Sequence, residues 1–342
     1  MNISSIIKFA FNFLLDSDRK PIFAMLKDIR ALKSQYNYNQ MSHYFTCLMY
    51  KKNSGMVSDY LSREELLPIP NKFHLHNGYH PVLSNKIAFR MYLQKKGLPL
   101  VKFLGEIKHN TIISDSGELI PLADTFKVQS VVHSWLEKHG SIFIKQANGL
   151  GGKGIFKFEK GQSINLSLLP SHEAYIIEVG INQHNLLNNI NPNCVSTLRV
   201  STFYSQGKVV MLSSFLKMGT GNSFVDNGAM GGIFVNYDIQ KNELDEVAYQ
   251  LPKCGGRSFF QHPNTGFVFK GCTLPYPAAI INLVTEAARA FPDKEIIGWD
   301  IAYTNHGPVI VEGNNNPDLT MTQICAKGIN NNPDFKLAYN LP

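Results

Sequence analysis

The sequence predicts an α+β fold of two or three lobes with a mainly helical N-terminal region. The chain has 342 residues, 44% of them hydrophobic, which is enough for more than one core. Short alternating segments meet at tight turns within residues 141–158 and 296–314, as the strands of antiparallel hairpins do. Helical patterns occur at 86–96, 128–139 and 278–291, and the last of these has the clearest apolar stripe.

Residues 1–83 form the first region, which we expect to be helical and then irregular. Its apolar start, residues 6–15, is too short to cross a membrane, and no small-residue cleavage site follows it. We expect an ordinary helix that packs on the body of the protein. The alternative is peripheral membrane contact through a surface anchor, because basic residues follow. These residues are Lys20, Lys27, Arg30 and Lys33.

The net charge of +7 and the pI of about 9.0 favour an anionic partner. The basic residues are scattered, and no zinc-finger or RNA-recognition signature occurs, so a nucleotide or an acidic sugar is a better candidate than nucleic acid. A solvated basic surface explains most of the excess about equally well. The five cysteines are widely spaced without a C-x-x-C pair, which predicts reduced thiols and a cytoplasmic location. Three clustered histidines without further metal ligands are expected to be structural or surface residues: His74, His76 and His80.

The central region, residues 84–178, is expected to form a small α+β lobe. It begins with a helix that Ser84 or Asn85 can cap and Gly97 can end. A glycine-rich turn then joins two strands, and its backbone N–H groups are free to point at phosphate oxygens. Neither a Walker A loop nor a Rossmann fingerprint is present, so a flexible hairpin is an equally good interpretation. The turn contains Gly149, Gly151, Gly152, Lys153 and Gly154.

Lys145 strengthens the phosphate interpretation of this turn. It lies four residues before the turn, on a strand that places Ile142 and Ile144 on one face and Phe143 and Lys145 on the other. A lysine among apolar neighbours is unfavourable unless it meets an anion. Lys145 and the turn are therefore a candidate phosphate site.

The C-terminal region, residues 179–342, contains a candidate metal hairpin. If residues 305–307 form its loop, Asp300 stands directly opposite Glu312, with Asn314 on the same face. Two opposed carboxylates in an apolar hairpin favour a shared proton or cation, and hard oxygen ligands suit magnesium. A turn one residue shorter would break this pairing. The alternative is a solvent-facing hairpin with two ordinary acids.

Two further features of this region involve polar side chains in unusual places. Arg199 lies in a strand that otherwise consists of small, β-branched and apolar residues, which indicates either a buried ion pair or a bound oxyanion. Asp226 and Asn227 belong to a polar, glycine-containing loop at 219–232. That loop either closes over a substrate or turns a hairpin.

In this order, the motifs resemble the ATP-grasp superfamily, and more narrowly the sugar-transfer-associated ATP-grasp family. The resemblance covers residues 84–320, and the motifs are specific as an ordered set rather than singly. It implies an ATP-grasp fold, in which two α+β lobes clasp ATP. The matching segments are Asn85-Lys86, Phe143-Ile144-Lys145 with the glycine turn, Ser196-Thr197-Leu198-Arg199, Val225-Asp226-Asn227 with Gly231-Gly232, and Gly298-Trp299-Asp300 with Glu312-Gly313-Asn314.

The resemblance also implies roles for individual residues. The implied ATP contacts are Lys86 and Lys145, the glycine turn, the adenine-reading hinge at Glu178 and Val179, and His184 or its neighbour Gln183 near the ribose. The implied magnesium ligands are Asp300, Glu312 and Asn314. The implied substrate contacts are Thr197, Arg199, Asp226 and Asn227. Arg199, which would neutralise the phosphoryl group, and Lys145 are the implied catalytic residues.

The reaction implied by this resemblance is an ATP-dependent carboxylate–amine ligation. A substrate carboxylate attacks the γ-phosphate to give an acyl-phosphate and ADP, and an amine then displaces phosphate. The expected substrates are a small acidic sugar or amino acid and an amine, used in surface-polysaccharide biosynthesis with ATP and Mg²⁺. A kinase acting on a hydroxyl and a non-catalytic nucleotide-binding scaffold are the alternatives. The substrate identities and the oligomeric state stay open at this point.

Overall fold

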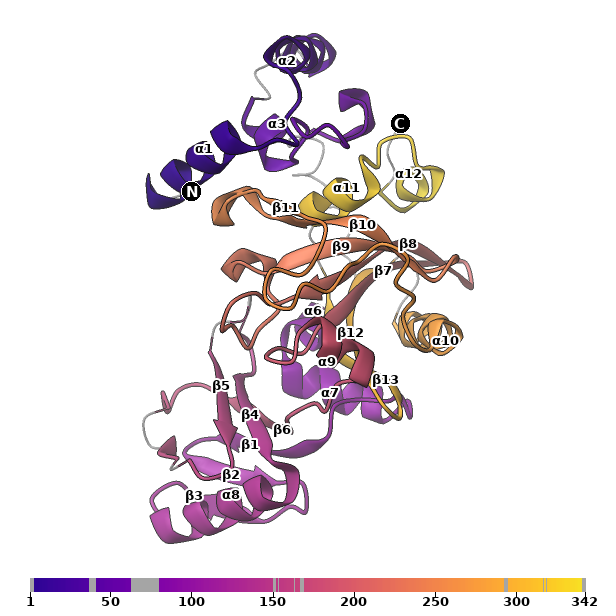
Figure 1. Cartoon of the computed structure of the whole chain (residues 1–342). Coiled ribbons are helices and arrows are strands. Elements are labelled where there is room, and N and C mark those ends of the chain that lie inside the picture. Colours follow the sequence, from indigo (N-terminus) through magenta and orange to yellow (C-terminus); the bar gives the residue numbers. More distant parts are fainter. Residues whose placement is uncertain are drawn as a thin grey trace.

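The computed structural model in Figure 1 confirms the predicted α+β class, because its strands form two antiparallel sheets of six and seven strands, accompanied by helices. It describes residues 3–36, 41–62, 80–149, 152, 154–162, 164–166, 169–291, 295–315, 317 and 319–339. The predictions for His74 and His76 lie outside these residues, as does the side chain of His80. Figure 1 places the smaller sheet at one end, the larger sheet in the middle and the N-terminal helices at the other end.

The six-stranded sheet forms the smaller lobe, in the strand order β3-β2-β1-β6-β4-β5, with antiparallel neighbours throughout. Helix α8 packs against it, and Asp124 caps this helix by accepting a hydrogen bond from the N–H of Lys127. Ile142 and Ile144 are buried in this core, which confirms the predicted alternation of β4. The elements are β1 (Phe103–Lys108), β2 (Thr111–Ser114), β3 (Leu119–Pro121), α8 (Thr125–His139), β4 (Ser141–Gln146), β5 (Ile155–Glu159) and β6 (Tyr175–Val179).

The seven-stranded sheet forms the larger lobe, in the order β11-β10-β9-β8-β7-β12-β13, again antiparallel. One face packs on α10, whose predicted apolar stripe is buried in the same core as the indole of Trp299. The elements are α9 (Asn185–Ile190), β7 (Thr197–Ser205), β8 (Lys208–Met218), η3 (Gly228–Met230), β9 (Ile233–Asp238), β10 (Glu243–Gln250), η4 (Pro252–Cys254), β11 (Ser258–Phe259), α10 (Pro277–Arg289), β12 (Glu295–Thr304) and β13 (Gly307–Asn314).

The opposite face of this sheet is covered by both ends of the described chain. Met25, Leu32 and Tyr44 share one core with Phe215 and Phe234 of the sheet, so the N-terminal helices pack on the larger lobe. Among the described helices, none combines the length and the apolar character needed to cross a membrane. The elements are α1 (Ile3–Leu15), α2 (Ile22–Tyr36), α3 (Met41–Thr46), η1 (Val57–Asp59), α11 (Leu319–Ala326) and α12 (Pro333–Tyr339).

Helix α7 (Lys86–Gln94), which follows α6 (His80–Ser84), connects the two lobes. Ile87 packs with Ile176 of the smaller sheet, whereas the ring of Phe89 lies 6.4 Å from the indole of Trp299 in the larger lobe. The Oδ1 atom of Asn85 accepts hydrogen bonds from the first N–H groups of the helix, which confirms the predicted cap. The cap fixes the start of α7, and therefore the position of Lys86 between the lobes.

Replacing Asn85 tests its role as the cap of α7. Asn85→Ala is expected to lower the free energy of unfolding by about 1 kcal/mol, because two N–H groups lose their acceptor. Asn85→Ser, which keeps a capping oxygen, is expected to restore most of the loss. Urea denaturation of the three proteins measures the difference, and equal stability of Asn85→Ala and wild type would contradict the capping role.

The hairpin of β12 and β13 differs from its prediction at the turn. The predicted three-residue loop is wrong, because Thr304 pairs with Gly307 and only residues 305–306 form the turn. Such a turn alone would have misaligned the acids. A register shift between Asp300 and Ile301, a β-bulge, compensates for the missing residue and places Asp300 opposite Glu312. The predicted pair is therefore present, but a bulge produces it instead of a longer loop.

Candidate active site

A cleft between the two lobes contains most of the predicted site residues. The smaller lobe contributes β4 and β6, the larger lobe contributes β7, β8, β12, β13 and the loop at 224–228, and α7 lies between them. The predicted residues that line it are Lys86, Lys145, Gly152, Glu178, Val179, Thr197, Arg199, Asp226, Asn227, Asp300, Glu312 and Asn314. Sequence segments more than 200 residues apart thus meet in one place.

Strand alternation explains how charged groups reach this cleft from a buried sheet. On β7, β8 and β12, each of Arg199, Lys217 and Asp300 stands between two buried apolar residues that point to the α10 side. The charged side chains therefore point together to the other face. The flanking residues are Leu198 and Val200, Leu216 and Met218, and Trp299 and Ile301.

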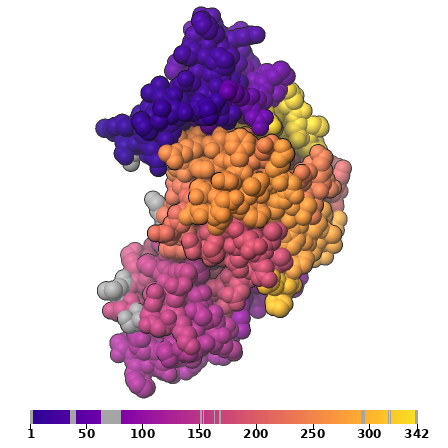
Figure 2. All heavy atoms as spheres, viewed as in Figure 1, coloured from indigo at the N-terminus to yellow at the C-terminus, as the bar shows by residue number. Residues whose placement is uncertain are grey.

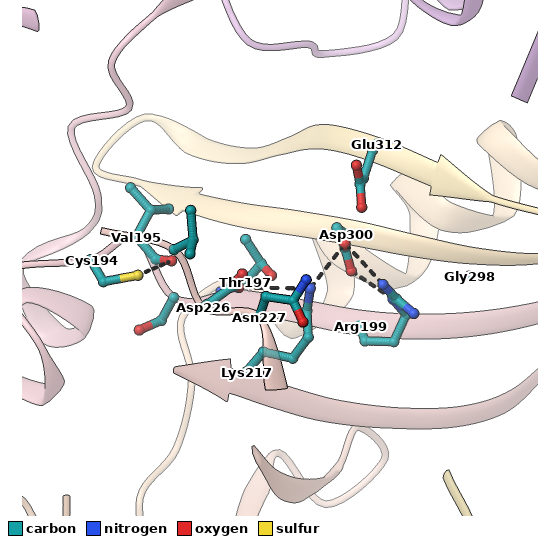
Figure 3. Close-up of polar contacts among 12 residues, drawn as sticks. Cys194, Val195, Thr197, Arg199, Lys217, Asp226, Asn227, Gly298, Asp300 and Glu312 are labelled. Atoms are coloured by element: carbon teal, nitrogen blue, oxygen red, sulfur yellow. Dashed lines mark hydrogen bonds and ion pairs between the residues drawn. The ribbon is translucent and has the colours of Figure 1, made fainter. Parts of the chain in front are cut away.

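Asp300 is the centre of a buried charge network (Figure 3). Its two oxygens accept hydrogen bonds from Nε and Nη2 of Arg199, at 2.6 and 3.0 Å, and from Nζ of Lys217 at 3.0 Å. Arg199 and Asp300 are direct cross-strand partners, so the bidentate pair follows from the register. Of the two interpretations of Arg199, the buried ion pair is present, and the guanidinium also lines the cleft.

The acids of the hairpin respond to this network in opposite ways. Burial alone would raise the pKa of Asp300, but the charges of Arg199 and Lys217 outweigh it and hold that pKa well below its ordinary value. Burial raises the pKa of Glu312, and the negative charge of Asp300 raises it further. Glu312 therefore faces an ionised neighbour and favours a proton or an additional cation.

The chemistry of these donors fits a magnesium ion. No three His, Cys, Asp or Glu side chains in the described part of the chain form a metal-binding group. The candidate ligands here are the two acids and the Asn314 amide. An ionised carboxylate has about four acceptor sites, of which Arg199 and Lys217 fill three on Asp300. Nδ2 of Asn314 donates to Glu312 at 3.2 Å, which holds the amide beside the carboxylate. Glu312, Asn314 and the remaining acceptor site of Asp300 supply hard oxygen donors of the type that Mg²⁺ prefers.

Lys217 is a site residue that the sequence analysis missed. Its side chain is 9% exposed, and its Nζ lies 3.0 Å from Asp300 and 3.7 Å from Asp226, so it joins the β12–β13 hairpin to the 219–232 loop. Burial alone would lower the pKa of Lys217, but the two carboxylates reverse the shift and raise it. The signal that singled out Arg199, a cation between apolar strand residues, also applies to Lys217 and would have identified it.

The cations at the other side of the cleft belong to α7 and β4. Nζ of Lys145 lies 2.8 Å from Glu178, the anion that its apolar strand required, and Arg90 lies 3.9 Å from the same carboxylate. Nζ of Lys86 donates to the carbonyl of Gly149, and burial lowers the pKa of Lys86. Both lysines are thus held inside the cleft by groups of the smaller lobe.

The glycine turn lies against the 219–232 loop of the other lobe. A Cβ atom at Gly152 would come within 3.4 Å of Met230 and 3.6 Å of Asn227, and φ there is +79°. The ring of Phe143, on the strand that enters the turn, lies 6.5 Å from that of Phe224. The two loops therefore approach each other across the cleft opening. Gly149 and Gly154 are the first and last residues of the turn, whereas Gly151 and Lys153 lie outside the described residues.

The predicted substrate residues form a second polar group beside Lys217. The carboxylate of Asp226 accepts hydrogen bonds from the backbone N–H of Thr197 at 3.1 Å and from its hydroxyl. Asn227 caps η3 by accepting from the N–H of Ala229 at 2.7 Å. Burial raises the pKa of Asp226, although Lys217 acts against this shift. The loop is thus tied to β7 and β8 at the floor of the cleft.

The two predicted ribose residues lie outside the cleft lining. His184 caps α9 by accepting from the N–H of Leu186, and its ring packs edge-on against Tyr276. Gln183 is buried and holds the backbone of the 191–196 segment through three hydrogen bonds. Both side chains therefore stabilise the backbone of the segment that connects the hinge to β7. By contrast, Glu178 and Val179 of the predicted hinge line the cleft.

Comparison with known proteins identifies the family of this chain. Residues 74–332, more than half of the chain, match the family model described as sugar-transfer associated ATP-grasp. The chain belongs to this family. The match includes every site residue named above and excludes α1, α2 and α3. No curated protein matches the sequence.

Several solved structures resemble this family member at low sequence identity. One is D-alanyl-alanine synthetase A from Vibrio cholerae, with 14% identity, a TM-score of 0.45, and coverage of 76% of this chain and 65% of the other. Carboxyaminoimidazole ribonucleotide synthase from Aspergillus clavatus, complexed with ATP, has 15% identity, a TM-score of 0.44 and coverage of 77% and 53%. The L-amino acid ligase from Bacillus licheniformis has 16% identity and a TM-score of 0.38, and the match covers 68% of this chain and 40% of the other. The chain thus spans less than two thirds of each of these proteins.

Proposed function

We propose that this ATP-grasp protein is a carboxylate–amine ligase that uses ATP and Mg²⁺ and acts through an acyl-phosphate. The observation that carries the proposal is that one cleft is lined by an acid pair and by cations from both lobes and the helix between them. The acids are the buried Asp300 and the half-buried Glu312, and the cations are Lys86, Lys145, Arg199 and Lys217. A triphosphate with its metal has complementary charges to both groups. The family's association with sugar transfer supports a sugar acid as one substrate and an amine or amino acid as the other.

The residues of the cleft divide into three tasks in this proposal. Lys86 and Lys145 bind phosphate oxygens, with the glycine turn closing over them. Glu312 and Asn314, with one oxygen of Asp300, would hold Mg²⁺, which supplies positive charge to the phosphates and orients them. The apolar part of the cleft, beside the hinge residues Glu178 and Val179, is the proposed adenine site. It is formed by Leu100, Val101, Ile181, Ile310 and Val311.

Arg199 and Lys217 act on the reacting groups. The substrate carboxylate oxygen forms a bond to the γ-phosphorus, the bond from that phosphorus to the β-phosphate bridge breaks, and ADP leaves. The amine nitrogen then attacks the acyl carbon, phosphate leaves, and the nitrogen loses a proton. Both steps gather negative charge beside these two fixed cations, which need no rearrangement to stabilise it. Asp226 and Thr197 lie close enough to Lys217 to position a substrate.

The proposal is tested by measuring ADP release with Mg²⁺, ATP and panels of uronic acids and amino acids. We expect ADP and phosphate to appear together, and only when an acid and an amine are both present. A stable phosphorylated product without free phosphate would instead identify a kinase acting on a hydroxyl. Nucleotide binding without turnover under any pairing would identify a scaffold.

Lys145→Ala is expected to reduce ADP release by roughly 100-fold or more, because a phosphate would lose a cation held in place by Glu178. The fold should remain intact, since Arg90 stays beside Glu178. Lys108→Ala is the matched control, because Lys108 is a surface cation of the same lobe, paired with Glu106. Full activity of Lys145→Ala would refute the assigned role.

A further inference from the structure

Helix α1 is apolar around most of its circumference, and the protein buries only one side of it. The rings of Phe9 and Phe13 pack edge-on against Phe45 and Tyr50. On the same side, Nδ2 of Asn12 donates to the carbonyl of Gly255 at 3.0 Å. These contacts fix the orientation of the helix on the larger lobe. Packing on the larger lobe does not explain why the other side of α1 is apolar as well.

The outer side of α1 carries a continuous row of large apolar side chains. Spacings of three and four residues place them one above the other on a single face. Scattered exposed apolar residues are ordinary on protein surfaces, but a contiguous row is typical of an interaction site. Its members, with exposed fractions of 51–78%, are Ile3, Ile6, Ile7, Phe11, Leu14 and Leu15.

Helix α2 adds a second exposed face that is apolar at its start and basic at its end. Ile22, Phe23 and Leu26 are exposed, with Phe23 at 87%, whereas Met25 and Leu32 are buried in the core on the other side. The helical spacing continues the exposed face into exposed basic residues. These are Lys27, Arg30 and Lys33, and Lys8 is exposed on α1.

The acidic side chains of the same segment do not neutralise these cations. Asp16 pairs with the buried Lys51, and Asp18 accepts a hydrogen bond from Ser258. Asp28 accepts from Lys20 at 2.8 Å and from the hydroxyl of Tyr44 at 3.1 Å. The acids therefore serve the interior contacts of the segment, and its exterior combines apolar and positively charged groups.

We propose that the outer faces of α1 and α2 bind an anionic lipid surface. An amphipathic segment with large apolar side chains and a basic border inserts its apolar groups among acyl chains while its cations meet anionic headgroups. With 13 residues, α1 lies on such a surface and does not cross it. A second copy of the chain is disfavoured as the occupant, because a symmetric contact would bring the two basic borders together.

The position of these helices leaves the catalytic cleft open during such binding. Figure 1 shows α1 and α2 at the end of the molecule farthest from α8, and Figure 2 shows the N-terminal residues projecting from that end. The cleft lies between the two lobes, and its described lining includes no residue of α1 or α2. Its charged floor, at Arg199 and Lys217, lies on the same face of the larger sheet as the N-terminal cover. The proposal is therefore independent of the proposed ligase activity and can be tested without turnover.

Insertion is tested by fluorescence of Phe11→Trp, with Phe126→Trp as the matched control. Phe126 is an exposed aromatic residue on α8 in the other lobe, and the two native tryptophans, Trp135 and Trp299, are buried. We expect a blue shift of Phe11→Trp emission on adding phosphatidylglycerol-containing vesicles, and none with pure phosphatidylcholine. Phe126→Trp should not respond. An unchanged Phe11→Trp spectrum with anionic vesicles would overturn the proposal.

Vesicle co-sedimentation separates apolar from charge contributions. The triple change Ile7→Gln, Phe11→Gln, Leu14→Gln is expected to weaken binding to anionic vesicles at least about tenfold, and Phe126→Gln should leave it unchanged. Reversing charge with Lys27→Glu, Arg30→Glu and Lys33→Glu should also weaken it. Binding that survives both changes contradicts the assigned surface. So does a wild-type dimer that the triple change converts to monomers while vesicle binding is absent, because that result assigns the face to a second copy.

Discussion

Glu312→Gln is expected to reduce ATP-dependent turnover strongly while making the nucleotide-free protein more stable. The substitution keeps the shape of the side chain but removes a carboxylate whose pKa burial and Asp300 hold above its usual value. The native state therefore becomes more stable when this charge is lost. Turnover should fall roughly 100- to 1,000-fold, because the proposed metal loses its principal charged ligand. ADP release and thermal denaturation measure the two effects.

The sign of the stability effect can be checked by pH. Folded protein binds a proton at Glu312 more readily than unfolded protein, so its stability decreases as pH rises from the ordinary glutamate pKa through the raised pKa of Glu312. Glu312→Gln lacks this loss. The difference in unfolding free energy between Glu312→Gln and wild type should therefore grow as pH rises across that window and then stay constant. A variant that is less stable than wild type at neutral pH would contradict the unfavourable burial of this acid.

Arg199→Met is expected to lower the free energy of unfolding by about 3–5 kcal/mol, the usual result of removing one partner from a buried ion pair. Asp300 would lose the bidentate guanidinium and, among the described side chains, keep Lys217 at 3.0 Å as its one charged partner. Arg199→Lys keeps the positive charge but cannot form the two parallel hydrogen bonds of the guanidinium, and should lower the free energy of unfolding by less. Chemical denaturation provides the measurement.

A double-mutant cycle separates this pair from the packing of the arginine side chain. In the Arg199→Met background, Asp300→Asn removes the stranded charge and should recover a large part of the lost stability. The double variant should nevertheless remain inactive, because the proposed reaction needs both groups. Independent, additive effects of the two substitutions would show that the observed pair is not energetically coupled.

The sequence predicted those parts of the fold that depend on local pattern. Asn85 caps α7, Ile142 and Ile144 alternate into the core, and α10 buries its stripe, because spacing and capping chemistry act within a few residues. The pairing of Asp300 with Glu312 was also predicted, although from a wrong turn. Two residues form the turn, and the bulge that restores the register left no recognised mark in the sequence.

The rest of the site depends on contacts across long sequence separations. Its place between apolar strand residues could have singled out Lys217, but its contact with Asp300 depends on the register of β8, β7 and β12, which a search for motifs does not supply. His184 lies in the expected segment, but its ring caps α9 and packs against Tyr276 and does not line the cleft. The exposed row on α1 illustrates the same point. Its composition was visible in the sequence, whereas only packing reveals which side is covered.

A crystal structure with Mg²⁺ and a non-hydrolysable ATP analogue tests the central claim most directly. The account predicts the triphosphate between Lys86 and Lys145 on one side and a metal ion bound by Glu312 and Asn314 on the other. An empty cleft, or a nucleotide bound with its phosphates away from these side chains, would contradict it.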